Sequence, residues 1–218
     1  MSFFILSLSF NFTYLLLLTT GTITLIEALR TENPLIRHIM NLETIISLVA
    51  GYFYSIFIEE INKPIIDWKK LVLTRYQDWV ISTPLMLLTL CLVLGMNTGR
   101  KSLSLREYLL ILLCNYSMLL CGYYGETHKL NKPMSCLLGF VFFTILFGYI
   151  YYLFFFNTKF RFQNYILYFY YLFVWSLYGC VFLLQEEEKN ICYNILDFVA
   201  KCFIGISLWA YYIDIFSW

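Results

Sequence analysis

The sequence has little charge for its length. Only 13% of its 218 residues are charged, 61% are hydrophobic, and the formal net charge is +1. A soluble domain carries about 25% charged residues, and a chain of this size still exposes much of its surface to water. This composition excludes a soluble domain and a disordered chain, and it offers no basic surface to nucleic acid. We therefore expect an integral membrane protein in a lipid bilayer.

Histidine is scarce, and the cysteines follow no pattern. The chain has two histidines, His38 and His128, and seven cysteines, which is an odd number without a C-x-x-C pair. Nearly all the cysteines lie in apolar runs, where cysteine behaves as a small buried apolar residue. The sequence predicts neither a disulfide framework nor a metal site.

No basic residue precedes Arg30, so the N-terminal apolar run lacks the charged start of a signal peptide. Apolar runs of about 20 residues recur between short polar breaks, and runs of that length cross a bilayer as helices. They lack the alternation of barrel strands. We predict one all-α domain over residues 1–218. Its seven transmembrane helices are expected at about 3–29, 36–58, 72–95, 104–124, 134–156, 162–184 and 191–213.

The predicted loops divide their basic residues almost evenly between the two sides of the membrane. One side has seven lysines and arginines and the other has six. The seven are Arg30, Arg37, Arg100, Lys101, Arg106, Lys159 and Arg161. Because basic loops favour the cytoplasm, we predict an outside N-terminus and a cytoplasmic C-terminus.

Six charged residues fall inside the predicted spans. They are Glu27, Glu43, Arg75, Asp78, Asp197 and Lys201. A charge at the bilayer centre costs at least about 2.5–3.5 kcal/mol, so each is a functional candidate. Asp197 and Lys201 are four residues apart and share one helix face. They could form a structural ion pair, or Lys201 could be an amine in a dry pocket that condenses with an aldehyde.

The third predicted span carries a polar stripe. Ser82 lies one turn from Asp78, and Thr89 returns to nearly the same face about three turns along. Serine and threonine often only bond neighbouring helices, but Asp78 and Arg75 on the same helix favour a functional polar track.

Two segments resemble microbial (type 1) rhodopsins. Residues 75–85 read RYQDWVISTPL, similar to the family's RYxDWxxTTPL, and residues 196–201 read LDFVAK, similar to LDxxAK. The resemblance implies a bacteriorhodopsin-like fold, with all-trans retinal bound to Lys201 as a protonated Schiff base. It implies that Asp78 is the primary counter-ion and proton acceptor, Asp197 the second counter-ion, and Arg75 and Ser82 their support.

The same resemblance implies a retinal pocket. Its residues would be Trp79, Thr83, Met86, Asn115, Met118, Gly122, Tyr171, Trp175 and Asp197. Asn115 replaces an aspartate of some members and could bond Thr83, and Met86 replaces the glutamine of blue-absorbing members, which predicts green absorption. The sixth helix lacks the family's first tryptophan and its proline.

Thr89 stands where many pumps carry a proton-donor carboxylate, and a threonine cannot donate at physiological pH. Glu43 lies about seven residues, or roughly 10 Å, inside the second helix, at about the depth of Thr89. Glu43 could be the donor, because burial favours a protonated carboxyl, or it could face a water-filled interface between protomers. Glu27 could pair with Arg30 or Arg37, or with a neighbouring protomer, or line a pore.

Glu186, Glu187 and Glu188 could hold a released proton on the outer side, or could form a solvated acidic loop. The short chain and Glu43 also resemble the viral rhodopsins of giant algal viruses, a branch with pentameric proton transporters and light-gated cation channels. The resemblance thus implies a light-driven outward proton transporter that is not an enzyme and forms a homo-oligomer, a pentamer by analogy. A light-gated cation channel and a light sensor with a partner protein are the alternatives.

Overall fold

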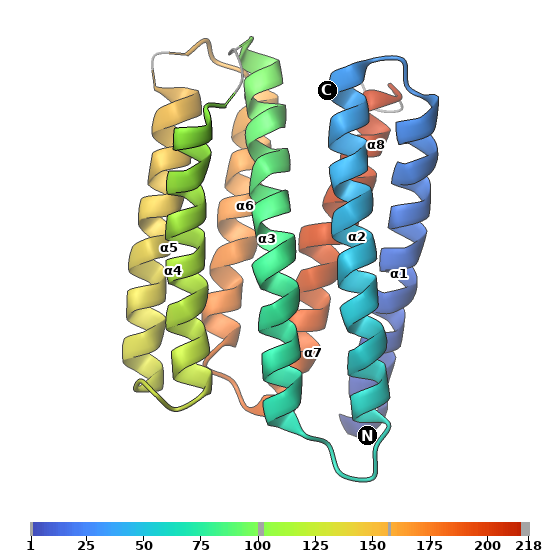
Figure 1. Ribbon diagram of the computed structural model, residues 1–218, viewed down its shortest axis with the longest axis vertical. Helices are drawn as coiled ribbons and strands as arrows, with labels where there is room; N and C mark the ends of the chain where they lie inside the picture. Colours follow the sequence, from blue (N-terminus) through green and yellow to red (C-terminus); the bar gives the residue numbers. More distant parts are fainter. Residues whose placement is uncertain (1, 100–102, 157, 215–218) are drawn as a thin grey trace. The chain divides into compact units, whose positions relative to one another are not determined.

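The computed structural model describes residues 2–99, 103–156 and 158–214, and these residues are almost entirely helical, without a strand (Figure 1). The helices are α1 (Ser2–Arg30), α2 (Pro34–Ile61), α3 (Trp68–Thr98), α4 (Leu105–Glu126), α5 (Lys132–Phe155), α6 (Phe162–Val181), α7 (Glu186–Asp197), the π-helix η1 (Phe198–Phe203) and α8 (Ile204–Tyr212). Because α7, η1 and α8 run on without a break, they form the seventh helix. The predicted all-α, seven-helix organisation is confirmed.

Six of the helices within the described ranges are long and apolar enough to cross a membrane, counting the seventh as one. The exception is α6, in which five of 20 residues are tyrosines. Tyrosine has an apolar ring and a polar hydroxyl, so it lowers the mean hydropathy of a helix that is still largely apolar.

Local capping sets several helix ends. The Asn33 side chain accepts from the backbone N–H of Leu35 and Ile36, and Pro34 begins α2. Ser104 and Glu107 form a reciprocal capping box at the start of α4. Such caps satisfy N–H groups that have no partner within the helix.

The predicted loop at residues 185–190 is wrong, because α7 already begins at Glu186. Glu186, Glu187 and Glu188 occupy its first turn, where carboxylates favour the positive end of the helix dipole. The seventh helix therefore begins five residues before the predicted position. Arg100 and Lys101, which entered the orientation argument, lie outside the described residues.

The structure divides into two compact units, and α3 contributes to both. The first unit comprises residues 1–82 and 184–218, which include α1, α2, the start of α3, and α7 to α8. Its apolar core is built mainly from α1 and α2. The buried core residues are Leu6, Phe10, Leu17, Ala50, Phe53, Tyr54, Phe57, Ile61, Leu71 and Cys202.

The second unit comprises residues 83–183, with the rest of α3 and α4 to α6. Aromatic rings of α5 and α6 pack together in it. Phe147 lies 5.9 Å from Tyr168 and 6.0 Å from Trp175, measured between ring centroids and with edge-to-face geometry. Asn164 is buried and donates to the carbonyl of Leu94 at 3.0 Å. The tyrosine-rich α6 thus buries part of its ring surface against α5.

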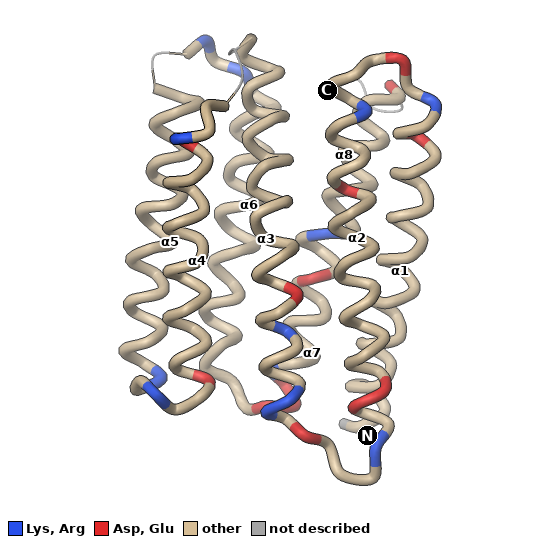
Figure 2. Tube along the Cα trace, in the orientation of Figure 1, with Lys and Arg blue, Asp and Glu red and all other residues tan. Residues whose placement is uncertain are grey.

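Charged residues gather at the helix ends, and a smaller group lies midway along α2, α3 and the seventh helix (Figure 2). The buried charged residues midway along these helices, Glu43, Arg75, Asp78, Asp197 and Lys201, all belong to the first unit. A charge far from both helix ends must find its partners inside the protein, because lipid offers none.

Candidate functional site

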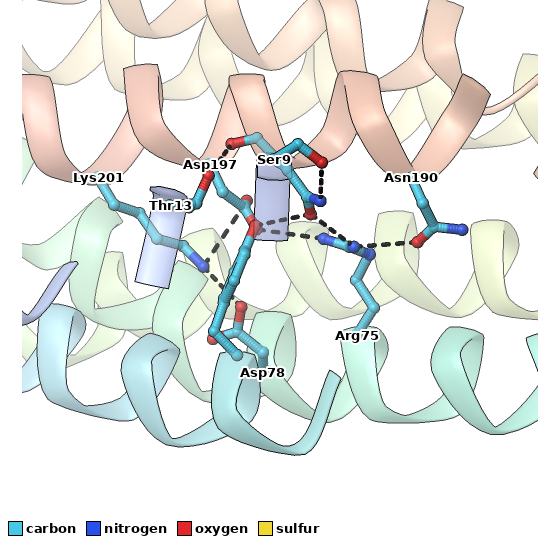
Figure 3. A network of polar contacts seen from close by, with 9 residues as sticks. Ser9, Thr13, Arg75, Asp78, Asn190, Asp197 and Lys201 are labelled. Carbon is cyan, nitrogen blue, oxygen red and sulfur yellow. Dashed lines mark hydrogen bonds and ion pairs between the residues drawn. The ribbon is translucent and has the colours of Figure 1, made fainter. Parts of the chain in front are cut away.

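Lys201 is the centre of a buried charge cluster in the first unit (Figure 3). Its side chain is 1% exposed, and its Nζ donates to Asp78 Oδ2 at 2.6 Å. Asp197 Oδ1 lies 3.7 Å from the same nitrogen. The expected pairing of Lys201 with Asp197 is therefore present, but the closer carboxylate comes from α3.

The cluster is electrically balanced. Arg75 and Lys201 supply two positive charges, and Asp78 and Asp197 supply two negative charges. Burial of an unpaired charge is strongly unfavourable, whereas a compensated set can persist in a dry interior. A primary amine in such surroundings fits an aldehyde cofactor, because condensation would leave a nitrogen whose positive charge Asp78 and Asp197 already balance.

Lys201 lies within a six-residue π-helix, Phe198–Phe203. Short π segments inside α-helices occur frequently at functional sites. A π segment holds one more residue than an α-helical turn, so the residues after it are rotated by about 100° around the helix axis. The helix face of Asp197 therefore cannot be followed into α8 by counting 3.6 residues per turn. The sequence predicts one regular helix here, and the π segment was not expected.

Arg75 is 3% exposed and joins Asp197 to two amides of α7. Its Nη1 donates to Asp197 Oδ2 at 3.3 Å, and its Nη2 donates to the Oδ1 atoms of Asn190 and Asn194, both at 3.0 Å. The Tyr54 hydroxyl lies 2.9 Å from Asp197 Oδ2 and 3.0 Å from Asn194 Oδ1. Asp197 Oδ2 thus accepts hydrogen bonds from Tyr54 on α2 and from Arg75 on α3.

Tyr54, Asn190 and Asn194 were not predicted as members of this cluster. The two asparagines carried a detectable signal, because residues 190, 194, 197 and 201 follow the 4-3-4 spacing of one helix face. Tyr54 carried none, since it is one of 19 tyrosines in the chain.

Ser82 and Thr89 are both fully buried on α3. Ser82 lies one turn from Asp78 in the first unit, and its buried hydroxyl has no hydrogen-bond partner among the described residues. Thr89 belongs to the second unit, so the polar track through both residues stays a prediction.

Glu43 is 1% exposed on α2, within the first unit. Its Oε2 packs so closely on the seventh helix that a Cβ added to Gly205 would lie 3.2 Å from it and 2.8 Å from Thr20 Cγ2. Thr24 and Thr44 form a buried hydroxyl pair at 2.9 Å between α1 and α2. Glu43 is therefore packed between helices of the first unit, whereas the alternative expectation had it facing a water-filled interface between protomers.

Glu27 is 8% exposed on α1 and forms no ion pair with a described residue. Arg37 donates instead to the carbonyl of Thr31 at 2.7 Å. The expected pairing of Glu27 with Arg30 or Arg37 is therefore absent from the described part of the chain.

Two charges that were assigned to loops are buried. Glu60, at the end of α2, is 2% exposed and accepts from Lys63 at 2.7 Å and Lys70 at 2.8 Å. Lys189, in α7, is 1% exposed and lies 2.8 Å from Glu186. The set of six buried charges was therefore incomplete, because both helices extend past their predicted ends.

Trp79 belongs to the first unit, where its ring meets Tyr193 edge-on at 5.1 Å. Asp197 also belongs to the first unit, and the remaining predicted pocket residues belong to the second. Thr83, Met86, Asn115, Tyr171 and Trp175 are buried there, and Met118 and Gly122 are half-buried. The expected bond between Asn115 and Thr83 is present, with Nδ2 donating to Oγ1 at 2.8 Å. The shared pocket stays a prediction.

Comparison with known proteins identifies a family that this chain matches. The family model for bacteriorhodopsin-like proteins matches residues 5–215. The solved structure of viral rhodopsin OLPVRII is 42% identical, with a TM-score of 0.91, over 97% of this chain and 99% of that chain. No curated protein sequence matches the chain.

Two more distant structures show the same fold. Thermophilic rhodopsin is 23% identical, with a TM-score of 0.75, over 96% of this chain and 92% of that one. The proton pumping rhodopsin AR2 from the marine alga Acetabularia acetabulum is 18% identical, with a TM-score of 0.76, over 97% and 96%. The match of the family model over nearly the whole length shows that the chain belongs to the bacteriorhodopsin-like protein family.

Proposed function

We propose that this protein is a light-driven outward proton transporter with all-trans retinal bound through Lys201. Membership of the family implies a retinal chromophore in an integral multi-pass membrane protein, and such proteins are light-driven transporters or photoreceptors rather than enzymes. The observation that carries the proposal is the buried contact of 2.6 Å between Lys201 Nζ and Asp78 Oδ2. In this contact the carboxylate that would accept the proton lies directly beside the nitrogen that would carry it.

Retinal supplies light absorption and an isomerisation that changes the proton affinity of the Lys201 nitrogen. Asp78 accepts the proton from that nitrogen across one hydrogen bond, and Ser82, one turn along α3, would support the Asp78 carboxylate. Asp197 accepts hydrogen bonds from Arg75 and Tyr54, so the two carboxylates have different partners and separate roles.

Glu43 returns a proton to the Lys201 nitrogen from the cytoplasmic half. A buried carboxyl holds its proton until a stronger base appears, which is what a donor requires. The burial of Glu43 against α8, which directly follows η1, supports this role over a place in an open pore. Glu27, which belongs to the same unit as Glu43, would line the entry to this path.

Release to the outside follows Arg75 toward the start of α7. Asn190 connects the two, because it accepts from Arg75 and donates to the carbonyl of Glu186 at 2.8 Å. Glu186, Glu187 and Glu188 lie in the first turn of α7 and would receive the proton. The N-terminus would then be outside and the C-terminus cytoplasmic, in a homo-oligomer for which the pentamer is an analogy.

Vesicles test the direction of transport. The protein is reconstituted with all-trans retinal, and the external pH is followed under illumination. The proposal predicts a light-dependent acidification of one side that a protonophore abolishes. A coloured protein without any light-dependent pH change would contradict it.

Glu43→Gln is expected to slow the return of the proton by about 100-fold or more, because a positioned proton donor contributes about 10²–10⁴ in rate. Flash spectroscopy measures the rate at which the Lys201 nitrogen regains its proton. In the variant that rate should rise in proportion to the bulk proton concentration, since water must then supply the proton. Glu32→Gln, at an exposed position between α1 and α2, is the control, and equal rates in both variants would exclude Glu43 as donor.

Gly205→Ala is expected to slow the same step more mildly, by displacing the Glu43 carboxylate and Thr20 from their close approach to α8. Gly148→Ala is the matched control, because nothing lies within 4 Å of a Cβ added there. Proton return is measured in both variants by the same flash experiment. An unchanged rate in Gly205→Ala would show that this packing does not position Glu43.

A further inference from the structure

Aromatic rings, two amides and the Asp197 carboxylate surround the Arg75 guanidinium. The rings of Phe57, Tyr193 and Phe10 lie 4.7, 5.4 and 5.7 Å from its Cζ. Its contact with Asp197 is 3.3 Å long, whereas its two contacts with asparagine oxygens are 3.0 Å. The guanidinium therefore donates its two shorter hydrogen bonds to neutral amide oxygens.

Both amides are oriented by contacts of their own. Asn190 Nδ2 donates to the carbonyl of Glu186 at 2.8 Å, and Asn194 Nδ2 donates to Ser9 Oγ at 2.9 Å. Thr13 Oγ1 donates to the backbone carbonyl of Asn194 at 3.1 Å, which ties this turn of α7 to α1. Because each amide nitrogen already has an acceptor, the amide oxygens are left to face Arg75.

An amide oxygen accepts a hydrogen bond at any pH, whereas a carboxylate loses much of its acceptor strength when it is protonated. The titratable groups that face Arg75 are Asp197, Tyr193 and Tyr54, with Lys201 and Asp78 beyond them. Glu60 and Glu186 pair with lysines instead. The hydrogen bonds from the guanidinium to Asn190 and Asn194 of α7 would therefore persist when a carboxylate of the cluster is protonated.

We propose that Asn190 and Asn194 are positioning residues for Arg75, which keep its positive charge on the Asp197 side through changes of protonation in the cluster. The guanidinium is then a fixed charge and does not swing between two positions when Asp78 or Asp197 takes up a proton. This inference uses the proposed pigment on Lys201 only as a reporter of charge.

The colour of the pigment reports the charge beside the Lys201 nitrogen, so acid titration of its absorption spectrum measures when a counter-ion carboxylate becomes protonated. Arg75→Gln should raise the midpoint pH of this colour change by about 1–3 units, since that is the usual effect of losing a nearby opposite charge. Asn190→Leu and Asn194→Leu should each raise it by a smaller amount, because the guanidinium then moves away from Asp197. Asn11→Leu, at an exposed position on α1, should leave the midpoint unchanged.

A double-mutant cycle separates positioning from general damage to the fold. If Asn190 acts through Arg75, adding Asn190→Leu to Arg75→Gln produces no further shift of the midpoint. Asn190 is the better member for the cycle, since Asn194 also accepts from the Tyr54 hydroxyl. Equal shifts in the presence and absence of Arg75 would overturn the proposal.

A second measurement needs no retinal. In the ¹⁵N NMR spectrum of the retinal-free protein, a held Arg75 guanidinium gives two separate Nη signals, and a freely rotating one gives a single averaged signal. We expect separate signals in the wild type and averaging in the Asn190→Leu/Asn194→Leu double variant. Averaging in the wild type would overturn the inference, whereas a protein that forms no pigment but shows held Nη signals would overturn only the proposed function.

Discussion

Lys201→Ala should remain colourless after addition of all-trans retinal, whereas Lys189→Ala should form pigment. Both lysines are buried in the same helix, with side chains 1% exposed, and both have a carboxylate partner within 2.8 Å. Lys201 has the carboxylates of Asp78 and Asp197 around its nitrogen and lies within the π segment, whereas Lys189 lies in the first turns of α7. The comparison therefore tests the surroundings of Lys201 rather than the burial of a lysine.

Folding must be controlled in this experiment. Removing Lys201 alone leaves two buried carboxylates opposite Arg75, and an uncompensated buried charge destabilises a protein by about 3–5 kcal/mol. The Lys201→Ala/Asp78→Asn double variant restores the balance, with one cation and one carboxylate. It should be monodisperse in detergent and still colourless. Pigment in that double variant, or a colourless Lys189→Ala protein that is folded, would refute Lys201 as the attachment site.

Asp78→Asn should abolish steady proton transport while the pigment still forms. An asparagine keeps the shape of the side chain but cannot accept a proton from Lys201 Nζ, and loss of a positioned base costs about 10²–10⁴ in rate. Removing this negative charge should also move the absorption maximum to longer wavelength, because the counter-ion stabilises the ground state of the charged pigment. Light-driven pH change in vesicles and a visible spectrum measure both effects.

Asp67→Asn is the control for this prediction, since Asp67 is exposed just before α3. Asp197→Asn separates the two carboxylates of the cluster. Asp197 accepts from Tyr54 and Arg75, so its loss should disturb the pigment spectrum and the Arg75 position more than the first proton transfer. Full transport by Asp78→Asn, with Asp197→Asn inactive, would exchange the roles of the two residues.

Sequence periodicity and charge predicted most of this molecule. The seven helices follow from apolar run length, and the Lys201 cluster follows from asking which charges could not be in loops. The sequence could not predict which carboxylate lies closer to Lys201. The four-residue spacing of Asp197 and Lys201 predicts a contact within one helix, but it gives no information on contacts with another helix. Asp78 is the closer partner at 2.6 Å, and that contact joins two elements 123 residues apart.

Other features depend on packing and could not be read from the chain. The π segment at Phe198–Phe203 changes no residue type and leaves no periodic signal, since the helix is apolar before and after it. Glu60 and Lys189 look like loop charges, because polar residues of the last and first helical turns resemble those of loops. Their burial depends on partners such as Lys70, which an isolated segment does not reveal.

Photocurrent measured against membrane voltage distinguishes an outward proton pump from a light-gated channel and from a sensor. Wild-type protein is expressed with all-trans retinal under voltage clamp, and the current during illumination is recorded at several voltages and two proton gradients. A pump gives an outward current that keeps one sign throughout and that Asp78→Asn removes. A current that reverses where the ion gradient balances the voltage would show a light-gated channel, and a coloured protein without current would show a sensor, so either result would contradict outward proton transport.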